Sequence, residues 1–386
     1  MTARRRSPAP IAALAVVVAL VALAAACRVP APGGPGHPGG GRGPQVRLNE
    51  IQVLASHNSY HVEPEPRLLA ALKESLGASA NGFEYTHRPL AEELDAGVRQ
   101  IELDVFADPD GGLYAAPKLV PLLGLAPVDR ALERPGLKVL HVQEVDYRST
   151  CPTLVACLTQ VREWSDANPR HLPITIQVEA KDGAIPDPGF GFVVPLPWTA
   201  ATFGELEAEI ASVFPPDRVL TPAEVRGRFA TLTQAVQAQR WTRLDRVRVQ
   251  VMFMLDDTGA KRDAYRARVP DLADRTVFVD VPASDPDAAV MVVNDPVGSA
   301  DRIRSLVEAG FIVRTRADAD TVQARTGDTT QRDAALASGA QYVSTDYVWP
   351  DDRFGTGYAV DLPGDTAARC NPVSAPRQCD RADLSG

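Results

Sequence analysis

Two stretches of this sequence carry side chains that could bind a cation and transfer protons. In the first, residues 48–60 (LNEIQVLASHNSY), a β-prone run over 51–56 is followed by His57 and Asn58. Histidine transfers protons near neutral pH, and an amide oxygen binds hard cations. A strand that ends in such a pair is typical of an active site at the mouth of an α/β barrel. The alternative is a loop histidine beside a capping asparagine.

The second stretch, residues 97–105 (GVRQIELDV), carries two acids two positions apart. Successive side chains of a strand point to opposite faces, so Glu102 and Asp104 share one face and the aliphatic residues share the other. We expect the aliphatic face to meet helices and the acidic face to point into a barrel. Two inward carboxylates are costly unless a cation or hydrogen-bond donors meet them. The alternative is a pair of structural acids.

The same alternation recurs at residues 174–181 (ITIQVEAK), where Glu179 and Lys181 share a face. The alternative there is an internal ion pair between these two residues. A further short run, residues 137–141 (LKVLH), predicts a strand that ends in His141.

If these four strands are neighbours, one amide oxygen and three carboxylates meet at one end of the sheet. These ligands are Asn58, Glu102, Asp104 and Glu179. Such oxygen ligands favour Ca²⁺, with Mg²⁺ as the second choice, and the absence of nitrogen or sulfur ligands argues against zinc. His57 and His141 would flank the cation as an acid and a base, or as an acid and a charge stabiliser.

Strand-like and helical runs alternate from residue 46 to about residue 345 without a change of composition. The predicted strands are 51–56, 99–105, 137–142, 173–180, 246–254, 276–281, 290–293 or 311–315, and 341–345. The predicted helices are 67–76, 89–96, 152–167, 204–213, 222–239, 260–268, 300–309 and 331–338. This order predicts a single α/β barrel of the TIM type over 46–354, followed by a C-terminal tail over 355–386.

The composition indicates a globular protein. The chain has 386 residues, of which 45% are hydrophobic and 23% charged, and a net charge of −9. This charge argues against a nucleic-acid partner. It does not argue against a lipid substrate, because local patches decide that.

The first 27 residues resemble a signal peptide. Three arginines at 4–6 precede an apolar run at 11–26, and small residues at 24–26 precede Cys27. The run is short for a membrane span, so we expect a secreted protein whose mature form has no transmembrane segment. The alternative is a lipid anchor on Cys27. Residues 28–45, rich in proline and glycine, predict a linker.

Four cysteines follow Cys27, which in an exported chain indicates disulfide bonds. Four cysteines allow three pairings. We expect Cys151–Cys157 and Cys370–Cys379, because each pair closes a short loop.

Several of these motifs together resemble one family along essentially the whole mature chain. They are SHNSY (56–60), ELD (102–104), LHVQEVDYRSTCPTL (140–154), WSDANPRHLPITIQVEAKD (164–182), STDYVWPDD (344–352) and RCNPVSAPRQC (369–379). The family is the bacterial calcium-dependent phosphatidylinositol-specific phospholipase C. Its wider relatives fold as a distorted TIM barrel, and the resemblance implies the same fold here.

The resemblance also implies a role for each site residue. His57 would stabilise charge on the phosphoryl group, and Glu102 would also act as the base on the inositol 2-hydroxyl. The implied calcium ligands are Asn58, Glu102, Asp104 and Glu179. Lys181 would bind phosphate.

His141 is the predicted second histidine, the general acid that protonates the leaving diacylglycerol oxygen. Its rivals are His61, which lies beyond the strand end, and His87, which lies in a loop before Arg88. His171 precedes a strand and so lies at the wrong end of a barrel.

Further residues follow strands and are predicted to reach the substrate. Arg314 and Arg316 share a strand face and would bind inositol or phosphate, and Tyr347, beside Asp346, would close the pocket. Asp256 and Asp257 follow another strand as supporting acids. Surface or structural pairing is the alternative for the arginines. Aromatic residues in a Pro/Gly-rich loop would touch a lipid surface or pack the loop: Phe190, Phe192 and Trp198.

The predicted function is calcium-dependent cleavage of phosphatidylinositol at a membrane surface, by a monomeric phospholipase C. A glycerophosphodiester phosphodiesterase or sphingomyelinase D-like barrel is the alternative enzyme, although its first strand would end in His-Arg and not in SHN. A non-catalytic lipid- or sugar-binding barrel is the alternative from another class.

Overall fold

The computed structural model describes residues 45–385, except 268–269 and 365. The chain divides into two units, Met1–Arg42 and Gly43–Gly386, and everything that follows concerns the second. The predicted signal peptide, Cys27 and nearly all of the linker therefore lie outside the described residues. No helix in the described part of the chain is long and apolar enough to cross a membrane.

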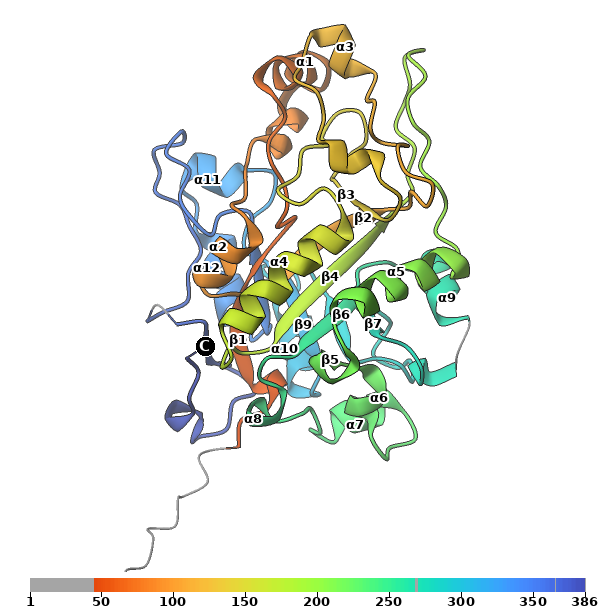
Figure 1. The fold of residues 1–386 in the computed structure, drawn as a ribbon. Helices are drawn as coiled ribbons and strands as arrows, with labels where there is room; N and C mark the ends of the chain where they lie inside the picture. Colours follow the sequence, from red (N-terminus) through yellow and green to blue (C-terminus); the bar gives the residue numbers. More distant parts are fainter. Residues whose placement is uncertain (1–44, 268–269, 365, 386) are drawn as a thin grey trace, which may run out of the picture. The chain divides into compact units, whose positions relative to one another are not determined.

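Parallel strands form the centre of the fold (Figure 1). They are β1 (Ile51–Ser56), β2 (Val98–Phe106), β4 (Ile174–Lys181), β6 (Val251–Leu255), β7 (Val277–Val279), β8 (Val290–Val292), β9 (Ile312–Arg316) and β10 (Tyr342–Thr345). Pairing runs β7-β6-β4-β2-β1-β10-β9-β8, and an isolated parallel bridge between Asp280 and Val290 joins the two ends. The predicted distorted TIM-type α/β barrel is confirmed.

Three short strands pair with members of this barrel. β3 (Lys138–Val139) is antiparallel to β2, β5 (Val219–Leu220) is parallel to β6, and β11 (Ala368–Cys370) is antiparallel to β1. The prediction of a barrel strand at 137–142 is therefore wrong. That run is too short to cross the barrel, and the segment between β2 and β4 makes an irregular excursion before its helix begins.

Two other predicted elements differ from the structure. The predicted strand at 246–254 begins as α8 (Leu244–Val247) and becomes β6 only at Val251, after Val249 takes a positive φ of 62°. The predicted helix at 222–239 is two helices, α6 (Pro222–Arg226) and α7 (Leu232–Gln237), because Gly227 ends the first at φ 53°. The runs 290–293 and 311–315, predicted as alternatives, are both strands.

Helices cover the outside of the barrel (Figure 1). The remaining ones are α1 (Pro66–Leu76), α2 (Leu90–Asp95), α3 (Leu119–Leu123), α4 (Leu154–Ala167), α5 (Ala200–Val213), α9 (Gly259–Arg266), α10 (Ala300–Glu308), α11 (Val322–Thr326) and α12 (Thr330–Ala337). Short 3₁₀ helices are η1 (Leu48–Glu50), η2 (Gly77–Phe83), η3 (Arg130–Glu133), η4 (Pro216–Arg218), η5 (Pro270–Leu272) and η6 (Cys379–Arg381). Threonine side chains cap the N-termini of α4, α5 and α6. They are Thr153, Thr199 and Thr221, in that order.

The two faces of β2 have opposite chemistry. Ile101, Leu103 and Val105 are fully buried in the main hydrophobic core. Glu102 and Asp104 are also buried, on the other face of the strand. The alternation in the sequence therefore predicted the two faces of this strand correctly, and the helix-covered core fixes which face is turned inward.

The C-terminal tail is part of the folded unit. β11 lies along β1, with Cys370 opposite Ile51, and Val360 and Leu362 are buried in the main core. Both predicted disulfides, Cys151–Cys157 and Cys370–Cys379, are present. The second closes the segment that follows β11 and so holds the tail against the first residues of β1.

We expect removal of the tail disulfide to destabilise the pairing of β11 with β1. In the chain-entropy account, a loop of this length stabilises the fold by about 2.5 kcal/mol. The double variant Cys370→Ser/Cys379→Ser should lose about that much free energy of unfolding in urea. Amide hydrogen exchange should rise in β11 first. An unchanged unfolding free energy would show that packing of the tail alone holds β11 on β1.

Candidate active site

Two adjacent strands bring the predicted acids together, and Asn58 follows a third. β1, β2 and β4 are neighbours in the barrel, and their parallel register places Asp104 of β2 opposite Glu179 of β4. Carboxylate oxygens of Glu102, Asp104 and Glu179 lie within 4.8 Å of one another. The cluster lies at the carboxyl end of β2 and β4, which in Figure 1 points towards β3 and α3.

Basic side chains offset part of this negative charge. Arg314 of β9, itself buried, donates a hydrogen bond from Nη2 to Glu102. Lys181 lies 3.1 Å from Asp104 and 3.1 Å from Glu179. The ion pair between Glu179 and Lys181 that the sequence left as an alternative is thus present, and Lys181 extends it to Asp104.

The cluster is nevertheless under electrostatic stress. Burial raises the pKa of Glu102 to about 8, against the opposing effect of Arg314, and neighbouring acids raise it further. Burial also raises the pKa of Asp104, although Lys181 lowers it. Such groups bind protons or cations readily, because either removes charge that the protein interior disfavours.

Asn58 completes the oxygen-rich surroundings. Its backbone has a positive φ of 47°, and its Nδ2 donates to the Tyr85 hydroxyl over 2.9 Å. Its buried Oδ1 accepts no hydrogen bond from any described residue, and neither does Oδ1 of Asp104. Ser59 links this turn to β2, since its backbone N–H donates to the carbonyl of Glu102 and its hydroxyl accepts from the N–H of Glu102.

These oxygens fit a hard divalent cation. The donors are one amide oxygen without a partner and three crowded carboxylates, and no imidazole or thiolate belongs to the same cluster. Ca²⁺ accepts such a flexible set of oxygen ligands, whereas zinc prefers nitrogen and sulfur.

A buried hydrogen-bond network that the sequence did not indicate fixes the end of β1. The Ser56 hydroxyl donates to Glu93 of α2 over 2.6 Å and lies 2.5 Å from the Ser59 hydroxyl. The other oxygen of Glu93 lies 2.5 Å from Nδ1 of His87. His87, a rival for the second histidine, is thus buried in a supporting role. No signal in the sequence pointed to Glu93, whose partner Ser56 lies 37 positions away on β1.

His57 lies on the β10 side of the cluster. Its Nδ1 is 2.7 Å from Asp346, and its Nε2 is 3.1 Å from Nη1 of Arg316 and 3.8 Å from Glu102. Nη2 of Arg316 also binds Asp346 over 2.9 Å. Burial and then the charge of Arg316 hold the pKa of His57 well below its usual range, although Asp346 opposes them. Asp346 thus orients the ring of His57, but its charge does not raise the pKa of this ring to the usual value.

His141 lies in the loop that follows β3. Its Nδ1 is 2.7 Å from Asp146, and Nε2 of His61 is 2.7 Å from the same carboxylate oxygen. Burial would lower the pKa of His141, but the hydrogen bond and charge of Asp146 raise it. A carboxylate shared by two imidazoles is the feature that the sequence did not predict.

Exposure separates the candidate histidines. The His141 side chain is 23% exposed, and its Nε2 has no hydrogen-bond partner among the described residues. His61 is fully buried, with its other nitrogen bound to the carbonyl of Tyr85. His171 binds Ser165 and the carbonyl of Leu172 at the start of β4, at the opposite end of the barrel. Only His141 among these presents an open nitrogen.

The remaining predicted residues surround the acids on the β9 and β10 side. Arg314 also binds Asn294 and Ser344, so it is held in place by three partners. Tyr347 is buried among aromatic rings, at 6.3 Å from Phe354 and 5.9 Å from Tyr358 between centroids.

Acids that follow β6 support the neighbouring strand. Asp256 accepts from the Gln177 amide over 2.7 Å, and Asp257 accepts from the backbone N–H of Ala180 over 2.7 Å.

A family model for phosphoinositide phospholipase C, Ca²⁺-dependent, matches residues 46–372. The chain belongs to this family. It is therefore a phosphodiesterase of the phosphoinositide phospholipase C type, as the sequence motifs implied. No curated protein sequence matches the chain.

Solved structures with a TM-score of 0.51 support the fold. A calcium-dependent phosphoinositol-specific phospholipase C from a Pseudomonas species is 18% identical, covers 84% of this chain and 95% of its own, and has a TM-score of 0.51. The same protein has been solved with myoinositol, with the same values. A Ca²⁺-dependent enzyme from Streptomyces antibioticus is 18% identical over 78% of this chain and 95% of its own, at a TM-score of 0.49.

We expect Asp146→Asn to lower the pKa of His141. The substitution removes the negative charge that opposes burial and weakens the hydrogen bond to Nδ1. Histidine NMR titration of the Asp146→Asn protein without metal would measure the change. His171, which does not contact Asp146, is the internal control. An unchanged titration of His141 would show that Asp146 does not control this ring.

Proposed function

We propose that the protein is an exported phospholipase C that cleaves phosphatidylinositol, with calcium, into diacylglycerol and a cyclic inositol phosphate. One observation carries the proposal. Glu102 lies 3.8 Å from His57, which Asp346 holds, and the charge of Asp104 acts on His141, which Asp146 holds. His57 therefore lies at the end of β1, and His141, with its open nitrogen, lies in the loop after β3.

Asn58, Glu102, Asp104 and Glu179 would hold the calcium ion. When bound, the ion would lower the proton affinity of the inositol 2-hydroxyl and offset phosphate charge. The protein contributes the rigid position of these oxygens: two strands in register, and a β1 turn fixed through Ser59.

The reaction is an internal attack. The 2-hydroxyl oxygen bonds to the adjacent phosphorus while the bond from phosphorus to the glycerol oxygen breaks. Glu102 would accept the proton of the attacking hydroxyl, and His141 would give its proton to the departing diacylglycerol oxygen. Attack by a neighbouring hydroxyl is favoured over attack by water because proximity is already established.

Charge on the phosphoryl oxygens would be met by His57 and by basic side chains. Nε2 of His57 and the Arg316 guanidinium lie 3.1 Å apart, so a phosphate oxygen could bind to both. Lys181 is assigned to phosphate binding, and Arg314 holds Glu102 in place. Tyr347, a predicted substrate contact, would act through packing of the Asp346 segment, because its side chain is buried.

Export agrees with the two disulfides, which form in oxidising compartments. The signal peptide, a lipid anchor on Cys27 and the monomeric state remain predictions from the sequence. The glycerophosphodiester phosphodiesterase or sphingomyelinase D-like alternative differs in its products, so product analysis decides between them.

We expect phosphatidylinositol vesicles to yield diacylglycerol and a cyclic inositol phosphate only when calcium is present. Chelator should abolish turnover. Asn58→Ala should raise the calcium concentration that gives half-maximal activity, because an oxygen ligand is lost. Phosphorus NMR of the products identifies the cyclic ester. Release of choline from choline lipids or of glycerol phosphate from glycerophosphodiesters, without a cyclic inositol phosphate from phosphatidylinositol, would contradict the proposal, as would full turnover in chelator.

The leaving group distinguishes the two histidines. His141→Ala should lower turnover of phosphatidylinositol by at least ~10²-fold, since a general acid contributes that much. It should lower turnover of an inositol 4-nitrophenyl phosphodiester far less, because nitrophenolate leaves without a proton. His57→Ala should impair both substrates. Equal losses for His141→Ala on both substrates would remove it as the general acid.

A further inference from the structure

A pocket lined by arginines lies at the amino-terminal end of the barrel strands. Its volume is about 540 Å³. Arg47 comes just before η1 and β1, while Arg240, Arg243 and Arg246 belong to the segment that leads through α8 to β6. In Figure 1 this end is marked by α8 and the start of β1. The acids of the candidate active site lie at the other end, where β2 and β4 finish, so the two sites are separate.

The lining of this pocket is positively charged. It contains four arginines, and Glu224 is the one acid among the described residues that line it. The carboxylate of Glu224 is already engaged, because its Oε2 accepts from the N–H of Thr221 over 2.9 Å at the start of α6. The chain as a whole has a net charge of −9, so this lining is a local exception. A cleft lined by charge of one sign attracts ions of the other.

The arginines of the pocket are poorly neutralised by the protein itself. Three of them form no ion pair with any described residue: Arg47, Arg240 and Arg246. Arg243 is paired with Asp245, whose side chain is 60% exposed. Glu50 accepts from the backbone N–H of Arg47 over 2.8 Å but does not pair with its guanidinium. The residues that precede the pocket, positions 1–44, contain no Asp or Glu that could pair with it.

The backbone holds the base of the pocket in place. An antiparallel bridge sets Arg47 opposite Arg243, and two backbone hydrogen bonds of 3.1 and 2.9 Å flank the bridge. Nη1 of Arg47 donates to the carbonyl of Trp241 over 2.7 Å. Trp241 is fully buried, and its Nε1 donates to the carbonyl of Gly310 over 2.9 Å. Because this base is already ordered, a ligand would pay little entropy to assemble it.

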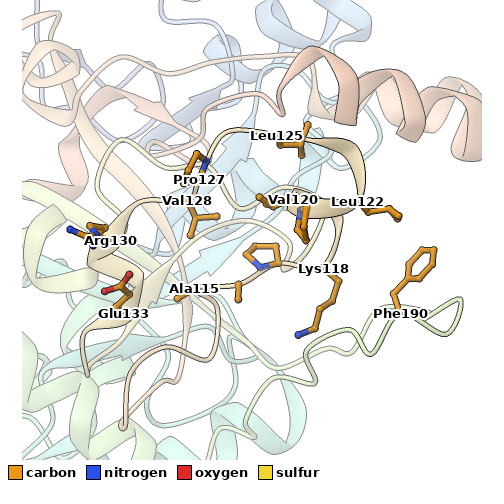
Figure 2. A pocket seen from close by; sticks show the side chains of 13 residues that line it. Ala115, Lys118, Val120, Leu122, Leu125, Pro127, Val128, Arg130, Glu133 and Phe190 are labelled. Carbon is orange, nitrogen blue, oxygen red and sulfur yellow. The ribbon is translucent and has the colours of Figure 1, made fainter.

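A second pocket shows that this charge is not a general feature of the surface. That pocket lies beside α3, and apolar side chains such as Val120 and Leu125 make up most of its lining (Figure 2). Its basic residues are Lys118 and Arg130, and Glu133 lies among them. The arginine pocket is therefore distinct in its chemistry as well as in its place in the fold.

Several guanidinium groups around one pocket match the chemistry of phosphate. Each guanidinium presents its N–H donors in a planar fork that fits two phosphate oxygens, and such charge-assisted hydrogen bonds are roughly twice as strong as neutral ones. A cation would be repelled here, and an apolar ligand would leave the guanidinium groups without a counter-charge. A ligand with more than one negative charge can bind several arginines at once.

We propose that this pocket is a binding site for a phosphate-bearing anion with at least two negative charges. The proposal is independent of the phospholipase chemistry, because the pocket lies at the opposite end of the strands from the acids of the candidate active site. Two sources share the required chemistry. One is a soluble polyphosphate or phosphate ester, and the other is the phosphate headgroup of an anionic lipid.

The first experiment measures binding of inorganic tripolyphosphate by calorimetry, without calcium or substrate. Arg240→Gln and Arg246→Gln should each weaken binding about tenfold, because each removes a charge-assisted hydrogen bond. Arg246→Lys should restore part of the affinity, since the charge returns without the planar fork. Binding should also weaken as the salt concentration rises. Tripolyphosphate held at the candidate active site would not respond to these substitutions.

Arg302→Gln is the matched control. Arg302 is exposed and forms no ion pair with any described residue, and it lies on α10, where its charge acts on Asp280 after β7. The control should bind tripolyphosphate as the unmodified protein does. The free energy of unfolding in urea should be the same for all these variants, which separates loss of the site from loss of the fold.

Vesicles of phosphatidic acid and phosphatidylcholine, without inositol lipid, distinguish the two sources. Weaker vesicle binding by the double variant Arg240→Gln/Arg246→Gln than by Arg302→Gln would identify a lipid headgroup as the ligand. Equal vesicle binding with weakened tripolyphosphate binding would identify a soluble anion. The proposal is overturned if the double variant and the unmodified protein bind both probes equally, or if Arg302→Gln loses as much affinity. Failure of the proposed phospholipase activity would leave these results intact.

Discussion

The repulsion among three crowded carboxylates, two of them buried, is the constraint on which the site depends. Glu102, Asp104 and Glu179 lie within 4.8 Å of one another, where like charges in a poorly solvated interior repel strongly. Such a cluster persists only if the surrounding structure holds it and cations meet it. Arg314 and Lys181 supply two positive charges from the protein, and the unpartnered oxygens of Asn58 and Asp104 leave room for a third.

The barrel provides the rigidity that this repulsion requires. Side chains at the ends of parallel strands cannot move apart without breaking the pairing of β2 with β4, which extends over seven residue pairs. At β1 the backbone leaves the strand through Asn58 at a positive φ, a conformation that a non-glycine residue holds only when its neighbours impose it. The hydroxyls of Ser56 and Ser59, with Glu93 behind them, impose it here. The same network therefore holds the turn, while the Tyr85 hydroxyl, which accepts from Nδ2 of Asn58, orients the amide.

The alternation of polar and apolar residues predicted that Glu102 and Asp104 point inward, because the alternation of side chains along a strand is a local property. It needs no knowledge of partners, and the apolar face of β2 fixes the direction. The partners of the histidines were not predictable in this way. His57 meets Asp346 across 289 positions, so their pairing depends on closure of the whole barrel. The strand before His141 was also mispredicted as a barrel strand. A two-residue antiparallel strand has the same local sequence pattern as the end of a longer parallel strand.

The two histidines differ because their carboxylates have different neighbours. Asp346 binds Arg316 as well as His57, so the arginine already neutralises the charge of this carboxylate. Burial and the charge of Arg316 then lower the pKa of His57 below its usual value. Asp146 is shared with His61, and no arginine or lysine forms an ion pair with it among the described residues. Its full charge then acts on imidazoles, which raises the pKa of His141 despite burial. Two imidazoles with similar Nδ1 contacts are thus suited to different tasks. His57 lies beside the guanidinium of Arg316, and His141 binds a proton more strongly than a free imidazole and has an open nitrogen.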